Sequence, residues 1–433
     1  MVKEPKHCSF CGIEASAAVP MIAGTEGYIC EACVMLASQV VSSWGKKKEL
    51  ADMQGPLPKP AEMKAMLDQY VIGQDLAKEI LSVAVYNHYK RLKNVSRKAG
   101  GLGDSDDSVE IGKSNILMIG PSGTGKTLLA STLAKIVGVP FAVADATTLT
   151  QAGYVGDDVE NILVRLLDVA DGQISRAEWG MVYIDEVDKI ARSPEQAFGT
   201  RDVSGEGVQQ ALLRLVEGSQ VKVSAKGRRK DHSGNDSVMI DTSNILFIAG
   251  GAFPGLEKHV EKRLLPPKTA IGFHAEVSNP DDKPTLEAML NATQPDDLKR
   301  FGLIPEFIGR FPVLAPLEPL DVDALIQVLT EPKNALVKQY QHLFAFDEVE
   351  LEFTKDALAE IAEKAIARNT GARGLRGIME HVLRRTMFDL PSRPDVQRCI
   401  VNAEVIRGEA EVEVVPREKS GETDDLKRLS GGE

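Results

Sequence analysis

The chain has 433 residues, a formal net charge of −12 at pH 7 and a pI near 5.3. This acidic balance argues against a dominant nucleic-acid-binding surface, because no long basic stripe is present to neutralise phosphates. No stretch approaches about 20 consecutive apolar residues, and residues 1–10 lack the apolar core of a signal peptide. With 43% apolar residues, we expect a soluble, cytoplasmic chain of about two to four domains that makes no contact with a membrane.

The first segment, residues 1–45, contains two C-x2-C pairs that are separated by 18 residues and ends in a predicted helix at 33–44. Each pair presents two sulfurs from one tight turn, and two such turns close a tetrahedron around zinc. A redox pair explains one C-x2-C but not two, and disulfides conflict with an intracellular chain. We therefore predict a structural zinc domain, used as an adaptor or dimerisation module, with the ligands Cys8, Cys11, Cys30 and Cys33.

A linker with three prolines, residues 46–60, precedes a large α/β domain at 61–317. Residues 61–93 have a helical pattern on both sides of an "IGQ" turn, and the polar, glycine-rich stretch 94–114 predicts a loop. We expect strands at 115–120, 140–145, 181–185 and 244–250, with helices at 126–137 and 157–170. Strands that alternate with helix-length segments predict a mostly parallel sheet covered on both faces.

The C-terminal part, residues 318–416, has few strand patterns. Helical patterns cover 321–343, 354–368 and 372–388, and a short strand is expected at 411–415. These elements predict a second, mainly helical subdomain. The composition of the end, residues 417–433, is typical of a disordered tail.

The stretch "GPSGTGKT", residues 120–127, fits the pattern G-x4-G-K-[ST] between a predicted strand and a predicted helix. Its backbone N–H groups would surround the phosphates of ATP, the lysine would pair with β and γ oxygens, and the last threonine would ligate Mg²⁺. A glycine-rich turn with an incidental lysine is the alternative, and the flanking elements disfavour it. The predicted phosphate site comprises Gly120, Pro121, Ser122, Gly123, Thr124, Gly125, Lys126, Thr127 and Leu128.

Two acids follow the apolar strand pattern "MVYI". Asp185 would hold Mg²⁺ through water, and Glu186 would polarise the water that attacks ATP. Paired acids after a strand also occur in ordinary turns, but the phosphate-loop pattern favours ATP hydrolysis. Charge on the γ-phosphate also requires cations, and the candidates are Arg310, Arg373 and Arg376. Taken alone, such arginines more often form surface salt bridges than act in catalysis.

The order of these motifs resembles the ClpX family of AAA+ protein unfoldases over residues 1–416. The stretches that carry the resemblance are the cysteine module, "GPSGTGKT", "GYVG", "VYIDEVDKI", "RDVSGEGVQQALLRLVEG", "IGF", "PEFIGRFP" and "GARGLR". The resemblance implies a ring of six subunits that binds ATP between neighbours. Such a ring grips tagged proteins, some delivered by adaptors, unfolds them and threads them into the ClpP peptidase; it also remodels proteins as a chaperone.

The resemblance assigns three groups of residues to the substrate path. The first pore loop would be Gly153, Tyr154, Val155 and Gly156, in which the aromatic ring offers contact area and the glycines permit movement. The second pore loop would be Arg201, Asp202, Val203 and Ser204. The pore entrance would be ringed by Arg228, Arg229, Lys230 and His232; here Asp231 interrupts the Arg-Lys-His triplet that is usual in the family.

The resemblance also assigns the remaining sites. Val71 and Ile72 would pack near adenine, Arg310 would act on the nucleotide of the neighbouring subunit, and Arg373 would act within its own subunit. The tripeptide Ile271, Gly272 and Phe273 would dock into apolar clefts of the peptidase, because an exposed Ile and Phe usually mark a partner site.

Three other functions remain open on the sequence alone. A remodeller without a peptidase would keep every ATP residue and need no Ile-Gly-Phe loop. A DNA-associated AAA+ motor would suit the zinc module and the basic loop, but the acidic balance and the apolar pore tip disfavour it. A zinc scaffold that holds ATP only as a structural ligand is disfavoured by the intact Glu186.

Overall fold

The computed structural model describes residues 7–16, 19–25, 27–37, 56–99, 109, 111–150, 157–192, 205–224, 237–264 and 284–417. Four groups of predicted functional residues lie outside this part of the chain. They are the two predicted pore loops (153–156 and 201–204), the basic residues within 228–232, and the tripeptide 271–273.

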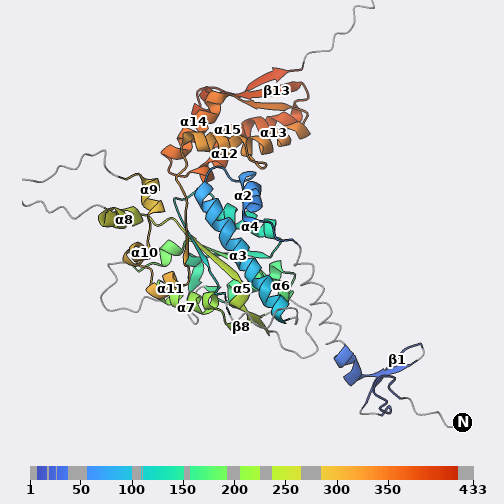
Figure 1. Cartoon of the computed structure of the whole chain (residues 1–433). Helices are drawn as coiled ribbons and strands as arrows, with labels where there is room; N and C mark the ends of the chain where they lie inside the picture. Colours follow the sequence, from blue (N-terminus) through green and yellow to red (C-terminus); the bar gives the residue numbers. More distant parts are fainter. Residues whose placement is uncertain are drawn as a thin grey trace, which may run out of the picture.

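A five-stranded parallel sheet forms the centre of the α/β unit (Figure 1), as the sequence predicted. Its order is β11 (Val313–Pro316), β3 (Ile116–Ile119), β10 (Leu246–Gly251), β7 (Met181–Asp185) and β4 (Phe141–Asp145). Strand β11 was not predicted, because its four residues end at Pro316 and lie between further prolines. All neighbouring pairs run parallel, so the carboxyl ends of β3, β7 and β10 meet at one edge.

Helices cover both faces of the sheet. In β3, Ile116 and Met118 belong to one buried cluster, while Leu117 and Ile119 belong to another, as expected when side chains alternate along a strand. The first cluster packs against α2 (Pro60–Asp68), α3 (Asp75–Ala99) and α4 (Lys126–Val137). The second packs against α5 (Asn161–Val169), α7 (Glu206–Glu217), α8 (Leu256–Leu264), α10 (Pro295–Phe301) and α11 (Pro305–Gly309).

Short elements complete this unit. They are α6 (Ile174–Ala177), α9 (Leu286–Asn291), η1 (Ala146–Thr148), η2 (Val187–Ile190), η4 (Thr242–Asn244), and the paired strands β5 (Leu149–Thr150) and β6 (Asp157–Asp158). Strands β8 (Gln220–Ser224) and β9 (Ser237–Asp241) form an antiparallel pair that the sequence patterns did not indicate. We name this pair the β8–β9 hairpin.

Two boundaries in the α/β unit were wrong. The predicted loop 94–114 begins too early, because α3 continues to Ala99. No proline or glycine occurs between Asp75 and Ala99 to end the helix sooner. The predicted helix 157–170 begins too early as well, because Asp157 and Asp158 pair with β5 before α5 starts.

The C-terminal subdomain is mainly helical, as predicted (Figure 1). It comprises α12 (Val322–Thr330), α13 (Leu336–Phe346), α14 (Lys355–Ala367), α15 (Ala372–Asp389), η6 (Leu390–Ser392) and α16 (Ala403–Arg407). The single helix predicted at 321–343 was wrong, since Pro332 separates α12 from α13. The expected final strand is confirmed as β14 (Glu413–Pro416). It pairs with β13 (Val396–Val401), which in turn pairs with β12 (Glu350–Phe353), and the sequence patterns indicated neither of these two strands.

The cysteine module is small and has its own pairing. Strands β1 (Met21–Ala23) and β2 (Tyr28–Cys30) form an antiparallel ribbon, and residues 31–37 are helical. The predicted helix 33–44 therefore begins two residues too late, and 38–44 lie outside the described residues. Within the described ranges, none of the helices is both long and apolar enough to cross a membrane.

Gln209 connects three parts of the α/β unit through one buried amide. Its Nε2 donates to the Ile190 carbonyl at 2.7 Å, and its Oε1 accepts from the Ile304 N–H at 2.9 Å. The side chain is fully buried. We predict that Gln209→Leu lowers the free energy of unfolding by about 2–4 kcal/mol, because both backbone groups lose their partner inside the core. Urea denaturation followed by circular dichroism measures this loss.

Gln210→Leu is the matched control, since Gln210 neighbours it on α7, is exposed and bonds only to Glu206 of the same helix. Equal denaturation midpoints for the two variants would show that the buried amide contributes nothing specific.

Candidate nucleotide site and metal centre

The predicted phosphate loop joins β3 to α4 at the carboxyl edge of the sheet. Gly125 precedes the first residue of α4 and has φ 95°, a left-handed conformation that glycine adopts without strain. The backbone N–H groups at the start of a helix are unpaired and carry partial positive charge. The loop therefore offers an anion site where the sequence placed it.

Lys126 is held inside this loop. Its Nζ donates to the carbonyl oxygens of Gly120 at 2.6 Å and Pro121 at 2.9 Å, and the residue is 8% exposed. Burial lowers the pKa of Lys126 to about 8, although the carboxylates of Asp185 and Asp188 raise it. At neutral pH the Lys126 side chain is mostly protonated. A phosphate that takes the place of the two carbonyls would therefore pair with an ammonium ion.

Asp185 collects three hydrogen bonds at the end of β7. Oδ2 accepts from Thr127 Oγ1 at 3.2 Å, while Oδ1 accepts from the Tyr183 hydroxyl at 3.1 Å and from the Glu186 N–H at 3.0 Å. Burial and the nearby Asp185 charge raise the pKa of Tyr183, so its hydroxyl remains a donor. The two side chains predicted to lie at the magnesium ion, Thr127 and Asp185, are thus in direct contact.

Glu186 has an unusual backbone conformation. Its φ of 57° and ψ of 34° place a non-glycine residue in the left-handed region. Such a conformation costs about 1–3 kcal/mol and persists where the surroundings enforce it. Here the strand β7 on one side and the 3-10 turn η2 on the other fix the backbone, and this strain singles out Glu186 in the site.

The C-terminal subdomain reaches the same site through the start of α15. A Cβ on Gly123 would lie 2.8 Å from the Thr370 carbonyl and 3.0 Å from the Ala372 nitrogen, so only glycine permits this approach. Arg373 is the second residue of α15, and its NH2 nitrogen lies 3.9 Å from Asp185 Oδ2. The geometry therefore brings together Lys126, Thr127, Asp185, Glu186 and Arg373.

The turn before α3 lies beside the phosphate loop. Val71 is buried, and its Cγ1 would be 3.9 Å from a Cβ on Gly125, whereas Ile72 is partly exposed. Lys78, which the sequence did not single out, donates to the Val71 carbonyl at 2.7 Å and to Asp68 at 2.6 Å. The predicted adenine residues are thus fixed next to the glycine that begins α4.

Gln74 connects this turn to the C-terminal subdomain and was also missed. Its Nε2 donates to the Glu318 carbonyl at 2.8 Å, and its Oε1 accepts from the Glu318 N–H at 2.8 Å. The residue is buried and has φ 61°. A glutamine beside Gly73 gave no signal of this contact, because its partner lies 244 residues away.

The other two candidate arginines lie elsewhere in the same chain. Arg310 donates from Nε to Glu217 at 2.9 Å, and its carbonyl accepts from Asn115 Nδ2 at 2.8 Å. Arg376 donates to Gln339 on α13 at 2.7 Å. Among the described residues, neither side chain has an ion pair with Asp185, in contrast to Arg373.

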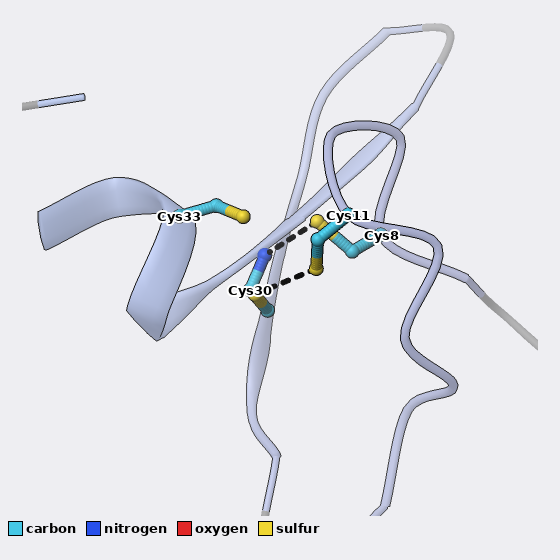
Figure 2. Close-up of side chains that lie close together, drawn as sticks. All are labelled: Cys8, Cys11, Cys30 and Cys33. Atoms are coloured by element: carbon cyan, nitrogen blue, oxygen red, sulfur yellow. Dashed lines mark hydrogen bonds between the residues drawn. The ribbon is translucent and has the colours of Figure 1, made fainter. Parts of the chain in front are cut away.

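The four predicted cysteine ligands converge in the N-terminal module (Figure 2). Their sulfurs lie within 4.8 Å of one another, and those of Cys11 and Cys30 are 3.7 Å apart. Zinc–sulfur bonds of about 2.3 Å place the sulfurs of a regular tetrahedron about 3.8 Å apart. The Cys30 N–H also points at Cys8 Sγ at 3.4 Å, which is the type of second contact that orients a thiolate ligand.

The electrostatics of this cluster favour a cation. Burial opposes ionisation of Cys8, but hydrogen bonds from Cys11 and Cys30 lower the pKa of Cys8 to about 6. Hydrogen bonding to Cys11, followed by burial, raises the pKa of Cys33 to about 12. The Cys8 thiolate thus forms readily, whereas ionisation of Cys33 is opposed by its neighbours. A bound divalent cation would stabilise both thiolates.

Three stretches of the chain match protein-family models in order. Residues 6–43 match the ClpX C4-type zinc finger, residues 112–314 an AAA domain (Cdc48 subfamily), and residues 320–403 the C-terminal, D2-small domain of ClpB protein. An ATP-dependent Clp protease ATP-binding subunit ClpX 3 from Methylococcus capsulatus is 67% identical over 415 residues, which cover 96% of this chain and 95% of the relative. The chain belongs to the ClpX family.

A second relative of this ClpX-family chain is the ATP-dependent Clp protease ATP-binding subunit ClpX from Azotobacter vinelandii. It is 57% identical over 395 residues, which cover 91% of this chain and 88% of the relative. The chain is therefore an ATPase with an AAA domain that implies ATP binding, and its C4 module is a zinc site. The family resemblance and the fold class expected from sequence are confirmed, and the ClpX zinc finger with its four clustered cysteines supports the expected Zn²⁺.

We predict that the purified ClpX-family chain holds one zinc ion per chain and that Cys30→Ser releases it. Three sulfurs cannot complete the four-coordinate site, and the buried Cys30 also anchors β2. Metal content by plasma mass spectrometry measures the loss, and ATP hydrolysis should change less than about twofold, because the metal folds only its own module.

The matched control is Cys399→Ser, since Cys399 is buried on β13 and lies outside the cluster. Stoichiometric zinc in Cys30→Ser, or its loss in Cys399→Ser, would contradict the assignment.

Proposed function

We propose that six copies of this ClpX-family chain form a ring that uses ATP hydrolysis to unfold tagged proteins and to thread them into the ClpP peptidase. The observation that carries the proposal is the convergence of Lys126, Thr127, Asp185, Glu186 and Arg373 at one sheet edge. The relatives, which are named as ATP-binding subunits of an ATP-dependent Clp protease, support the link to a peptidase. The proposed setting is the cytoplasm, with no nucleic acid or membrane as partner.

In this proposal ATP lies with its phosphates on residues 120–128 and its base near Val71 and Ile72. Lys126 would leave the carbonyls of Gly120 and Pro121 to pair with β and γ oxygens, which the loop then surrounds with N–H groups. Thr127 and Asp185 would hold Mg²⁺ between them, directly and through water. When bound, Mg²⁺ neutralises the negative charge that develops on the phosphates.

Glu186 would orient and polarise the attacking water. Its left-handed backbone directly follows the strand that ends at Asp185, so Glu186 lies beside the residue proposed to hold Mg²⁺. Arg373 would stabilise charge on the γ-phosphate from the same subunit, and its distance of 3.9 Å from Asp185 supports this role. Because Arg373 belongs to α15, loss of the γ-phosphate would release the C-terminal subdomain from the loop.

Arg310 would serve the nucleotide of the neighbouring subunit. Its side chain is about half exposed at 53%, and it is held by Glu217 on α7 rather than by its own phosphate loop. Asn115 fixes its backbone from the segment that enters β3. The guanidinium of Arg310 could therefore contact the nucleotide of the neighbouring subunit while its backbone stays fixed to the sheet.

The substrate path belongs to residues outside the described part of the chain. We propose that Tyr154 and Val155 grip the polypeptide, that residues 201–204 form the second pore loop, and that Arg228, Arg229, Lys230 and His232 select substrate tails. We further propose that Ile271, Gly272 and Phe273 dock on the peptidase and that the zinc modules dimerise to receive substrates and adaptors. The same motor acting without a peptidase would remodel proteins as a chaperone.

We predict that Glu186→Gln binds ATP with an affinity close to that of the wild type but hydrolyses it at least about 100-fold more slowly. The neutral amide cannot accept a proton from the attacking water. Phosphate release measures the rate, and equilibrium binding of a fluorescent ATP analogue measures the affinity. Glu363→Gln on the exposed side of α14 is the control. Turnover within about threefold of the wild type would remove the assigned role of Glu186.

We predict that Tyr154→Ala keeps ATP hydrolysis within about threefold but slows the unfolding of a stable tagged protein at least about tenfold, since the loop loses its aromatic contact area. Loss of fluorescence from a tagged fluorescent protein, without any peptidase, measures unfolding.

Deletion of residues 271–273 supplies the paired control. It should leave unfolding unchanged and abolish degradation when ClpP is added. Normal unfolding by Tyr154→Ala would contradict the pore-loop assignment, and normal degradation by the deletion variant would contradict the docking assignment.

A further inference from the structure

Three basic side chains donate to three successive backbone carbonyls at the base of the β8–β9 hairpin. The donors come from α3 and from the segment that enters β3, and the acceptors form the 3-10 turn η4. The pairs are Lys113 Nζ with the Thr242 oxygen at 3.0 Å, Arg91 NH2 with the Ser243 oxygen at 3.4 Å, and His88 Nε2 with the Asn244 oxygen at 3.1 Å. We name His88, Arg91 and Lys113 the carbonyl clamp.

The turn η4 fixes where the hairpin leaves the sheet. Strand β9 ends at Asp241, which pairs with Gln220 of β8, and β10 begins at Leu246. Asp241 caps the turn by accepting from the Ser243 N–H at 2.9 Å. Any rotation of η4 therefore changes the direction of both hairpin strands.

The opposite side of η4 is held by the end of α7. The Thr242 N–H donates to the Ser219 carbonyl at 3.0 Å, and Thr242 Oγ1 accepts from the Ser219 N–H at 2.9 Å. These bonds fix one edge of the turn. The Thr242 carbonyl accepts both from the Ile245 N–H at 3.2 Å, within the turn, and from Lys113 of the clamp. The clamp is thus a second, independent anchor of the hairpin base.

The protonation states suit this arrangement. Burial, and then the charges of Arg91 and Lys113, lower the pKa of His88 to about 3, so its imidazole is neutral and Nε2 carries the proton toward the Asn244 oxygen. Burial and the charge of Arg91 lower the pKa of Lys113 to about 7, while Asp241 opposes this effect. The charges of Arg91 and Lys113 repel one another, and the carbonyl dipoles of η4 compensate that repulsion.

The clamp has few other partners. The Nδ1 of His88 and the Nε of Arg91 are buried without a hydrogen bond in the described part of the chain. Lys113 Nζ lies 4.7 Å from the centre of the Phe247 ring on β10, in a cation–π contact. The orientation of the clamp side chains thus depends on the turn that they hold.

Both segments that carry the clamp also enter the nucleotide site. Helix α3 starts directly after the turn that contains Val71 and Gln74, and His88 lies about 20 Å along it from Asp75 at the usual rise per residue. Lys113 lies seven residues before Gly120, at the entrance to β3 and the phosphate loop. The hairpin base is therefore bonded to the two segments that flank bound ATP.

We propose that His88, Arg91 and Lys113 are positioning residues that orient the β8–β9 hairpin relative to the nucleotide site. This inference rests on the proposed function, in which Arg228, Arg229, Lys230 and His232 select substrate tails. Within the described residues, the clamp's hydrogen bonds go to η4 and not to Lys126, Asp185 or Arg373, so it would act on the affinity for tagged substrate rather than on ATP chemistry.

The test compares Lys113→Met with Lys90→Met, which removes an exposed lysine from α3 that makes no contact with η4. Amide hydrogen exchange over residues 237–244 should accelerate about tenfold in Lys113→Met, since a hydrogen bond to a charged group is lost. The KM for a tagged substrate should rise about fivefold, while kcat and the basal rate of ATP hydrolysis change less than about twofold. Lys113→Arg, which keeps a charged donor, should restore most of both losses.

Exchange over residues 237–244 that is equal in Lys113→Met and Lys90→Met would overturn the proposal. Faster exchange with an unchanged KM would also overturn it, because the clamp would then hold the hairpin without affecting selection. If Lys113→Met unfolds globally, Arg91→Gln replaces it under the same criteria. If the wild-type protein unfolds no tagged substrate, the proposed function fails, while the exchange comparison still decides whether the clamp holds the hairpin.

Discussion

The carboxylate of Asp185 is the contact on which the nucleotide site depends. It accepts from Thr127 on α4, from Tyr183 on its own strand and from the backbone of Glu186, and Arg373 lies close to it. One side chain thus fixes the start of a helix, the strained residue after β7 and the first turn of α15. Each of these elements would have more freedom without that shared acceptor.

The neighbouring strand is adapted to this contact. A Cβ on Gly250 of β10 would lie 2.2 Å from the Tyr183 hydroxyl, so no larger residue fits while that hydroxyl reaches Asp185. The parallel register of β7 and β10 places the glycine at this point. A buried tyrosine, an aspartate and a glycine on the adjacent strand therefore form one unit, although they look unrelated in the sequence.

The two subdomains share more than the phosphate site. Gln74 bonds both backbone groups of Glu318, which lies between β11 and α12, and Lys333 donates from its N–H to the Gln69 carbonyl at 2.9 Å. The turn predicted to contact adenine is thereby bonded to the connection between subdomains. In the proposed function, binding of the base beside this turn would therefore act on the connection between the subdomains through these hydrogen bonds.

The sequence predicted those parts of the site that lie in continuous motifs. Residues 120–128, Asp185 and Glu186 follow buried strands, and the cysteine spacing suffices for a tetrahedral cluster, so local patterns determine their positions. Gln74 and Lys113 gave no signal, because their partners lie 244 and 129 residues away. The helix predicted at 321–343 failed for another reason: apolar spacing continues across Pro332, while the backbone cannot.

The left-handed backbone of Glu186 lowers the stability of the fold at the residue to which we assign water activation. A glycine at this position would release about 1 kcal/mol of conformational strain, yet it would remove the carboxylate assigned to water activation. The inactive protein would thus hold its β7–η2 junction with less strain than the active one. Selection for folding alone would favour that loss, whereas the proposed function requires the glutamate for turnover.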